Sequence, residues 1–225
     1  MRSIKGHRFF CSWSGGKDSC LALYHAIQNR GRPGFLVTMM GEDGRRSMSH
    51  GLPITVFQEQ ANAIGIPLIT RPTSWDRYEE TFLLSLHELK QRGIEFGAFG
   101  DIDVEEHLEW CRRVCAAEDI YPYHPLWKRD RRELLDEFVA LKFKATIIAV
   151  RQGVLDEGFL GKIISAEVIR ELEASGIDPS GETGEYHTVV TDGPIFSHQI
   201  QLEIRDRVLR DGCLVLDVSI AGDNS

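Results

Sequence analysis

The sequence predicts an α/β fold: a parallel sheet with helices on both faces, followed by a smaller α+β domain at the C-terminal end. Short apolar runs alternate with amphipathic runs between residues 9 and 118, which is the pattern of parallel strands joined by helices. The pattern changes near Pro122, and the tail around Arg210-Asp211-Gly212 has the turn residues of a hairpin. The length of 225 residues allows one large or two small domains. We therefore predict two domains, 1–125 and 126–225.

In the first half, strands are expected where short apolar runs are bounded by turn residues, at 9–13, 35–40, 66–70 and 96–100. Helices are expected where apolar residues recur at helical spacing, at 20–27, 53–65, 77–92 and 104–118. The first helix should end near Gly31, with Pro33 beyond it. Pro53 suits the first turn of the second helix.

In the second half, a helix is expected at 131–141 and a strand rich in β-branched residues at 144–150. Another helix should follow near 166–174, and the hairpin strands should cover 199–209 and 213–220. The basic run Lys128 to Arg132 precedes the first of these helices. It is either a solvated helix start or a contact for a phosphate or a partner.

The six residues Ser14 to Ser19, with the sequence SGGKDS, lie between the first strand and the first helix. A glycine-rich turn at the start of a helix presents several backbone N–H groups to one point, and Lys17 adds a positive charge. The segment therefore predicts a phosphate-binding loop, although a simple glycine-rich turn with a solvated lysine is the alternative. Its spacing differs from that of the P-loop of kinases and GTPases.

Two further loops should lie near this one. Gly41 to His50 follows the second strand, and Gly100-Asp101 follows the fourth. In a parallel sheet, ligands bind at the carboxyl ends of the strands. We therefore expect the three loops to converge on one site.

A second motif covers Gly181 to Thr188, with the sequence GETGEYHT. It has no helical period, and its two carboxylates could bind Mg²⁺, orient an ammonium ion or bind a ribose. His187 could transfer a proton, although a structural role is the alternative. For the motif as a whole, the alternative is an exposed turn.

Composition narrows the function. A net charge of −8 argues against a nucleic-acid substrate. No apolar run is long enough to span a bilayer, and the N-terminus lacks the apolar core of a signal peptide, so we expect a cytoplasmic protein. The five cysteines include no Cys-x-x-Cys, which gives little support to a zinc ribbon, an iron–sulfur site or a redox dithiol. Cys111 and Cys115 share one helix face, and we expect them in the core.

The loop SGGKDS resembles the pyrophosphate loop (PP-loop) of the N-type ATP pyrophosphatases, which cleave ATP to AMP and pyrophosphate. Together with Gly100-Asp101-Ile102, Pro125-Leu126-Trp127 and GETGEYHT followed by Asp192-Gly193-Pro194, it resembles the diphthine–ammonia ligase family over nearly the whole chain. Asp178-Pro179-Ser180-Gly181 is more similar to the bacterial branch of that family, which implies a carboxylate substrate other than diphthine. The resemblance implies an adenine nucleotide alpha-hydrolase-like first domain and a family-specific substrate domain.

The resemblance also implies a reaction. A substrate carboxylate attacks the α-phosphorus of ATP, pyrophosphate leaves with Mg²⁺, and ammonia displaces AMP to form an amide. The implied catalytic residues are Lys17, Asp18 and Glu185, with Asp18 also holding Mg²⁺. The implied ATP-binding residues are Ser14, Gly15, Gly16, Lys17, Asp18, Ser19, Met39, His50, Gly100 and Asp101. The implied substrate-binding residues are Glu182, Tyr186, His187 and Thr188.

We therefore expect an ATP-dependent, AMP-forming carboxylate–ammonia ligase. Its partners would be ATP, ammonia and a carboxylate, for which a modified elongation-factor side chain is one candidate. Two alternatives stay open: an RNA-modifying adenylating enzyme, and a nucleotide-binding regulatory module without turnover. The sequence leaves the oligomeric state open, with a homodimer among the candidates.

Overall fold

The computed structural model describes residues 2–222. Its contacts group the chain into two compact units, which we describe separately. The first unit contains the chain up to Ser14 together with Asp18–Ile54 and Gly65–Arg129. The second contains Gly15–Lys17, Thr55–Ile64 and the chain from Asp130 onward. Within residues 2–222, no helix combines the length and apolar character needed to cross a membrane.

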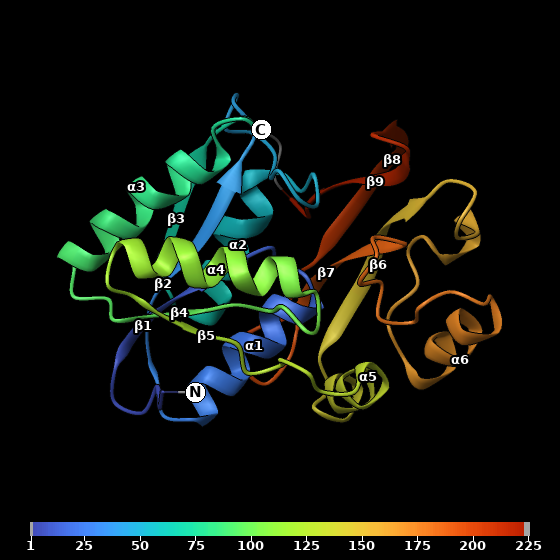
Figure 1. The fold of residues 1–225 in the computed structure, drawn as a ribbon. Coiled ribbons are helices and arrows are strands. Elements are labelled where there is room, and N and C mark those ends of the chain that lie inside the picture. The colour runs from blue at the N-terminus through green and yellow to red at the C-terminus, as the bar shows by residue number, and fades with distance from the viewer. Residues whose placement is uncertain (1, 223–225) are drawn as a thin grey trace. The chain divides into compact units, whose positions relative to one another are not determined.

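The first unit is built on a five-stranded sheet of order β3-β2-β1-β4-β5, in which every neighbouring pair is parallel (Figure 1). The strands are β1 (Arg8–Ser12), β2 (Arg32–Met40), β3 (Leu68–Pro72), β4 (Phe96–Ala98) and β5 (Tyr121–Tyr123). The predicted parallel sheet is thus confirmed. We did not predict β5, because it has only three residues and Pro122 stands in its middle. Proline is tolerated there because β5 is an edge strand.

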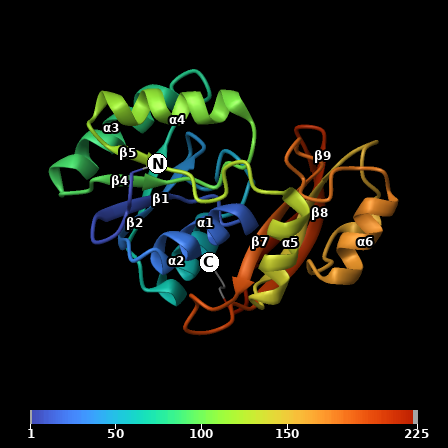
Figure 2. The same cartoon turned by 60° about the horizontal axis from the view of Figure 1, so that its bottom comes forward.

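Helices cover both faces of this sheet, as predicted (Figure 2). They are α1 (Lys17–Gln28) on one face, and α3 (Tyr78–Gln91) and α4 (Glu105–Ala117) on the other. The alternation of side chains along β1 explains how each face is filled. Phe10 packs with Phe82 of α3 and Val114 of α4 in one buried cluster. Cys11 points to the other face, where its thiol contacts the Ser19 carbonyl at 3.7 Å.

The second unit is built on an antiparallel sheet of order β7-β6-β9-β8. Its strands are β6 (Lys144–Arg151), β7 (Tyr186–Asp192), β8 (Leu202–Arg210) and β9 (Cys213–Ile220). Its helices are α5 (Arg131–Ala140), α6 (Ala166–Ala174), the short η1 (Glu157–Phe159) and the part of α2 (Ile54–Ile64) that begins at Thr55. The last three residues of GETGEYHT therefore lie in a strand, where Tyr186 pairs with Val150 of β6.

The basic run at Lys128 to Arg132 is paired with acidic side chains. Asp130 caps α5 by accepting a hydrogen bond from the Glu133 amide at 2.9 Å. Lys128 lies 3.5 Å from the Glu105 carboxylate, and Arg132 lies 3.0 Å from Asp136. These partners agree with the interpretation of this run as a solvated helix start.

Candidate active site

The loop Ser14 to Ser19 connects β1 to α1, and its backbone geometry requires glycine at one position. Gly15 has φ +75°, and a Cβ atom there would lie 2.7 Å from the Gln60 side-chain oxygen. Both observations indicate that a larger residue would be strained at this position. At the other end of the loop, the Ser14 hydroxyl donates to the Ser19 hydroxyl at 3.1 Å.

In the second unit, the loop is bound to β7. The Gly15 carbonyl accepts hydrogen bonds from the Val190 amide at 2.9 Å and from the Gln60 amide group at 3.0 Å. The Lys17 amide donates to the Thr188 hydroxyl at 3.1 Å. Because Lys17 is the first residue of α1, Thr188 satisfies one of the amides that a helix N-terminus leaves without an intrahelical partner. This amide was among those expected to face a phosphate.

The second motif brings its aromatic residues beside the loop lysine. Lys17 is only 6% exposed, and its ammonium group lies 5.7 Å from the centre of the Tyr186 ring. Burial, followed by the positive charges of Lys17 and Arg151, lowers the pKa of His187 to about 4. His187 is therefore neutral at pH 7. This positive surrounding favours an anion.

The two carboxylates of the motif have different settings. Glu185 is buried, and it accepts hydrogen bonds from the Thr183 amide at 3.1 Å and from the Thr183 hydroxyl. Glu182 is partly exposed, and its amide donates to Asp178 at 3.2 Å. Glu185 is thus held within the turn.

Asp178 organises this turn, and we did not predict a role for it. Its carboxylate accepts hydrogen bonds from the Ser180 amide at 3.0 Å and the Ser180 hydroxyl at 2.6 Å, and it pairs with Arg131. These contacts outweigh burial and lower the pKa of Asp178. The Asp-Pro-Ser-Gly sequence carried the signal, because Asp commonly accepts from the amide two residues later. The Tyr186 hydroxyl donates to the Pro179 carbonyl at 2.6 Å, so it is engaged in the same turn.

Gln60 is a second residue that we did not predict. It is fully buried on α2, and its amide group donates to the Gly15 and Val190 carbonyls at 3.0 and 2.8 Å. A lone glutamine on an amphipathic helix gave no signal in the sequence. Its role depends on which segments meet in three dimensions.

In the first unit, Gly100 lies against the start of α1. A Cβ atom at Gly100 would lie 2.8 Å from the Asp18 carbonyl carbon and 2.9 Å from the Ser19 nitrogen. The backbone at Gly100 therefore lies too close to the start of α1 to leave room for a side chain. Met39 is buried in the core beside Phe10, and His50 is half-buried in the loop after β2.

The Asp101 carboxylate faces other groups than the loop. It lies 3.5 Å from His107 and 3.3 Å from His124, and the Cys111 thiol contacts it at 3.6 Å. Burial would raise the pKa of Asp101, but the histidine contacts hold it well below its usual value. Burial, followed by the charge of Asp101, raises the pKa of the Cys111 thiol.

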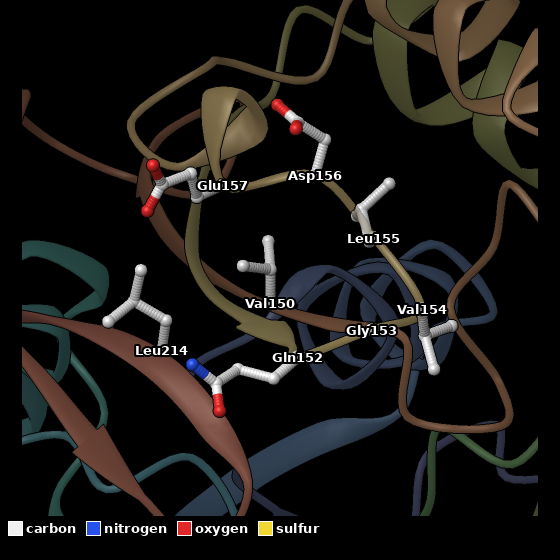
Figure 3. A pocket seen from close by; sticks show the side chains of 8 residues that line it. All are labelled: Val150, Gln152, Gly153, Val154, Leu155, Asp156, Glu157 and Leu214. Atoms are coloured by element: carbon white, nitrogen blue, oxygen red, sulfur yellow. The ribbon is translucent and has the colours of Figure 1, made fainter.

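The open hollows of the described residues include two that are each lined by residues of a single unit. One, of about 500 Å³, lies around the segment after β6 (Figure 3) and is lined by Val150, Gln152, Gly153, Val154, Leu155, Asp156, Glu157 and Leu214. The other, of about 460 Å³, is lined by Arg2, Ser3, Ile4, Lys5, Gln28, Asn29, Arg30 and Tyr123. Neither hollow is lined by a predicted site residue.

Comparison with known proteins matches both halves of the chain. The diphthamide synthase N-terminal domain matches residues 7–120, and the diphthamide synthase C-terminal domain matches residues 130–216. A diphthine–ammonia ligase of Danio rerio is 27% identical over 223 residues, covering 87% of this chain and 86% of that protein. Those of Rattus norvegicus and Homo sapiens are 28% identical, covering 87% of this chain and 83% of each protein.

A solved structure from Methanocaldococcus jannaschii, described as a predicted subunit of tRNA methyltransferase, aligns with a TM-score of 0.43 at 15% identity. It covers 81% of this chain and 96% of that chain, but the likeness is too slight to bear on fold or function. The two domain matches identify the family, because together they extend over most of the chain, with the N-terminal domain before the C-terminal domain. The chain therefore belongs to the diphthamide synthase family.

Proposed function

We propose that this chain is an ATP-dependent, AMP-forming ligase that converts a carboxylate and ammonia to an amide; the proposal is supported by its relatives, which are named diphthine–ammonia ligases. The observation that carries the proposal is the loop Ser14 to Ser19, with its glycine-only geometry at Gly15 and its buried lysine at Lys17. Such a loop at a helix N-terminus suits the phosphates of a nucleotide.

The reaction takes two steps. A carboxylate oxygen attacks the α-phosphorus of ATP, the bond to the β-phosphate oxygen breaks, and pyrophosphate leaves. Ammonia then attacks the acyl carbon, AMP leaves with the electron pair of the broken C–O bond, and the amide nitrogen loses a proton. Charge grows on the leaving pyrophosphate in the first step. Lys17 and the loop amides would stabilise this charge.

The donor set of the loop fits a triphosphate. It offers the hydroxyls of Ser14 and Ser19, the ammonium of Lys17 and the backbone at Gly15 and Gly16. Mg²⁺ prefers carboxylate and phosphate oxygens, and Asp18 in the first turn of α1 would hold it. We further propose that Met39, His50 and the backbone at Gly100 and Asp101 complete the ATP site.

The substrate side of the site would come from the second motif. We propose that Glu185 orients ammonia as a catalytic residue and that Glu182, Tyr186, His187 and Thr188 contact the acyl group. The pKa of about 4 keeps His187 neutral near pH 7 and makes it a weak base, so we propose that its ring contacts the acyl group as a neutral side chain. We also propose a cytoplasmic location, a homodimer, and a modified elongation-factor side chain as one candidate for the carboxylate. In this proposal residues 1–125 bind ATP and residues 126–225 bind the substrate.

The test is product analysis with a lysine variant. The wild-type protein with ATP, Mg²⁺, ammonia and diphthine-bearing elongation factor or small carboxylates should release AMP and pyrophosphate in equal amounts. Lys17→Met should lower turnover by at least about a hundredfold, because removing one charge-stabilising group commonly costs that much. Lys5→Met is the matched control, since Lys5 is exposed.

Release of ADP and phosphate would contradict the proposal, as would full turnover by Lys17→Met. Tight AMP binding without pyrophosphate release from any carboxylate would instead favour the regulatory module.

A further inference from the structure

Four side chains with metal-binding atoms gather in the first unit. Asp101 follows β4, His124 follows β5, and His107 and Cys111 lie on α4. The donor atoms of Asp101, Cys111 and His124 all lie within 4.8 Å of one another. His107 and Cys111 are four residues apart, so they share one face of α4.

The buried histidine is the observation that points to a ligand. His124 is only 3% exposed, and its Nε2 atom makes no hydrogen bond of normal geometry, although it lies 3.3 Å from the Asp101 carboxylate. The His124 ring stacks on Phe99, with the ring centres 5.2 Å apart and the planes 16° from parallel. This stacking fixes the direction of Nε2. A buried polar atom without a hydrogen bond is costly and calls for an explanation.

The separations of the donor atoms of Asp101, Cys111 and His124 are compatible with tetrahedral coordination. Zinc bonds of about 2.0–2.3 Å at tetrahedral angles separate neighbouring ligand atoms by about 3.4–3.6 Å. The Asp101 Oδ2 atom lies 3.3 Å from His124 Nε2 and 3.6 Å from the Cys111 sulfur, while His107 Nδ1 lies 3.5 Å from the other carboxylate oxygen, Oδ1. The two separations from Oδ2 agree with the tetrahedral values. If His124 served only to bind Asp101, its Nε2 atom would be expected to form a hydrogen bond of normal geometry, and it does not.

We propose that Asp101, Cys111 and His124 bind one Zn²⁺ ion, and that His107 moves in from the same helix face as the fourth ligand. The mixed nitrogen, sulfur and oxygen donors favour zinc, while Mg²⁺ and Ca²⁺ prefer oxygen ligands only. On binding, the Cys111 S–H bond breaks, the sulfur bonds to the metal, and the proton passes to solvent. His107 is the most exposed of the four and would close the site last. The ion would fasten α4 to the ends of β4 and β5.

Cobalt provides the probe, because Co²⁺ enters such sites and absorbs light. The full chain is stripped with EDTA, dialysed and titrated with CoCl₂, and then ZnCl₂ is added. We expect one Co²⁺ per chain, with a thiolate-to-cobalt band in the near ultraviolet and the visible bands of tetrahedral cobalt. Zinc should remove both sets of bands.

Two variants and a matched control identify the ligands. Cys111→Ser should lose the thiolate band, whereas Cys115→Ser should keep it, because Cys115 is equally buried on the same helix but outside the cluster. His124→Phe keeps a ring against Phe99 and removes the nitrogen, and it should weaken cobalt binding at least about tenfold. That change corresponds to 1.4 kcal/mol.

Absence of stoichiometric cobalt binding by the wild-type protein would overturn the proposal. Binding without a thiolate band, or equal loss of the band in Cys115→Ser, would also overturn it. If Cys111→Ser fails to fold, the wild-type spectrum and His124→Phe decide the question. None of these measurements uses ATP, so they do not depend on the ligase activity.

Discussion

Gln60 offers the sharpest test of how the second unit holds the loop. Its amide group donates to the Gly15 carbonyl at 3.0 Å and to the Val190 carbonyl at 2.8 Å, and the side chain is fully buried. The Val190 amide also donates to the Gly15 carbonyl at 2.9 Å. Gln60 therefore joins the loop to β7 through two carbonyl groups.

We consider the substitution Gln60→Leu, which keeps the size of the side chain and removes both donors. Each lost hydrogen bond costs about 1 kcal/mol, and a buried acceptor left without a partner adds about 1–3 kcal/mol. The Gly15 carbonyl keeps its hydrogen bond from the Val190 amide. The cost of a buried acceptor without a partner therefore arises only at the Val190 carbonyl, which loses the Gln60 donor. We therefore expect a loss of about 3–5 kcal/mol in the free energy of unfolding.

The assay is urea denaturation, with pyrophosphate binding measured by calorimetry on the same samples. Gln58→Leu is the matched control, because Gln58 is exposed two residues earlier on α2 and should change stability by less than about 0.5 kcal/mol. Pyrophosphate binding should weaken in Gln60→Leu by about tenfold, or 1.4 kcal/mol, because Gly15 loses a fixing contact. Equal stability of the two variants would refute this reasoning. So would unchanged pyrophosphate binding in a destabilised Gln60→Leu protein.

Three further predictions follow from the described contacts. Gly100→Ala should shift the start of α1 and weaken ATP binding measured by calorimetry, because its Cβ would lie 2.8 Å from the Asp18 backbone. Gly41→Ala should be tolerated, because its Cβ would lie 3.6 Å from the Arg46 carbonyl oxygen, and equal binding by both variants would contradict this prediction. The pKa of His187 is lowered from 6.5 to about 4, so the unfolded chain binds one more proton between these values, and stability should fall by up to about 3 kcal/mol as the pH drops from 6.5 to 4. Denaturation of wild type and His187→Gln across this window checks it, and identical pH slopes would rule it out. Arg131→Gln removes the ion pair to a partly buried Asp178 and should cost about 1–2 kcal/mol of stability, with the pKa of Asp178 rising in an NMR titration; an unchanged pKa would show that Arg131 does not act on it.

Much of the first unit follows from local patterns in the sequence. Apolar runs at 9–13 and 35–40 became β1 and β2, and helical spacing at 77–92 and 104–118 became α3 and α4. These patterns are readable because a strand buried on both faces needs continuous apolar residues, while a helix covering one face needs a period of 3.6. The loop Ser14 to Ser19 was equally readable, because its glycines and lysine serve a local turn geometry.

The second motif was only partly readable. Its composition marked Gly181 to Thr188 as unusual. It did not indicate that Tyr186 begins β7 or that the Thr188 hydroxyl accepts a hydrogen bond from the Lys17 amide. Strand pairing with β6 decides the first, and a contact between residues 171 positions apart decides the second. Neither distant partner is marked by local sequence.

Local sequence patterns were enough to predict the alternating strands and helices, the loop Ser14 to Ser19 and the burial of Cys111 on the apolar face of its helix. Only the tertiary structure placed Asp101 and His124 beside that cysteine, because parallel pairing of β4 and β5 brings the ends of two strands together under α4. Cysteine spacing along the chain gave little support to a metal site. The donors here come from three separate elements, and their distances depend on the packing of those elements and not on their separation in sequence.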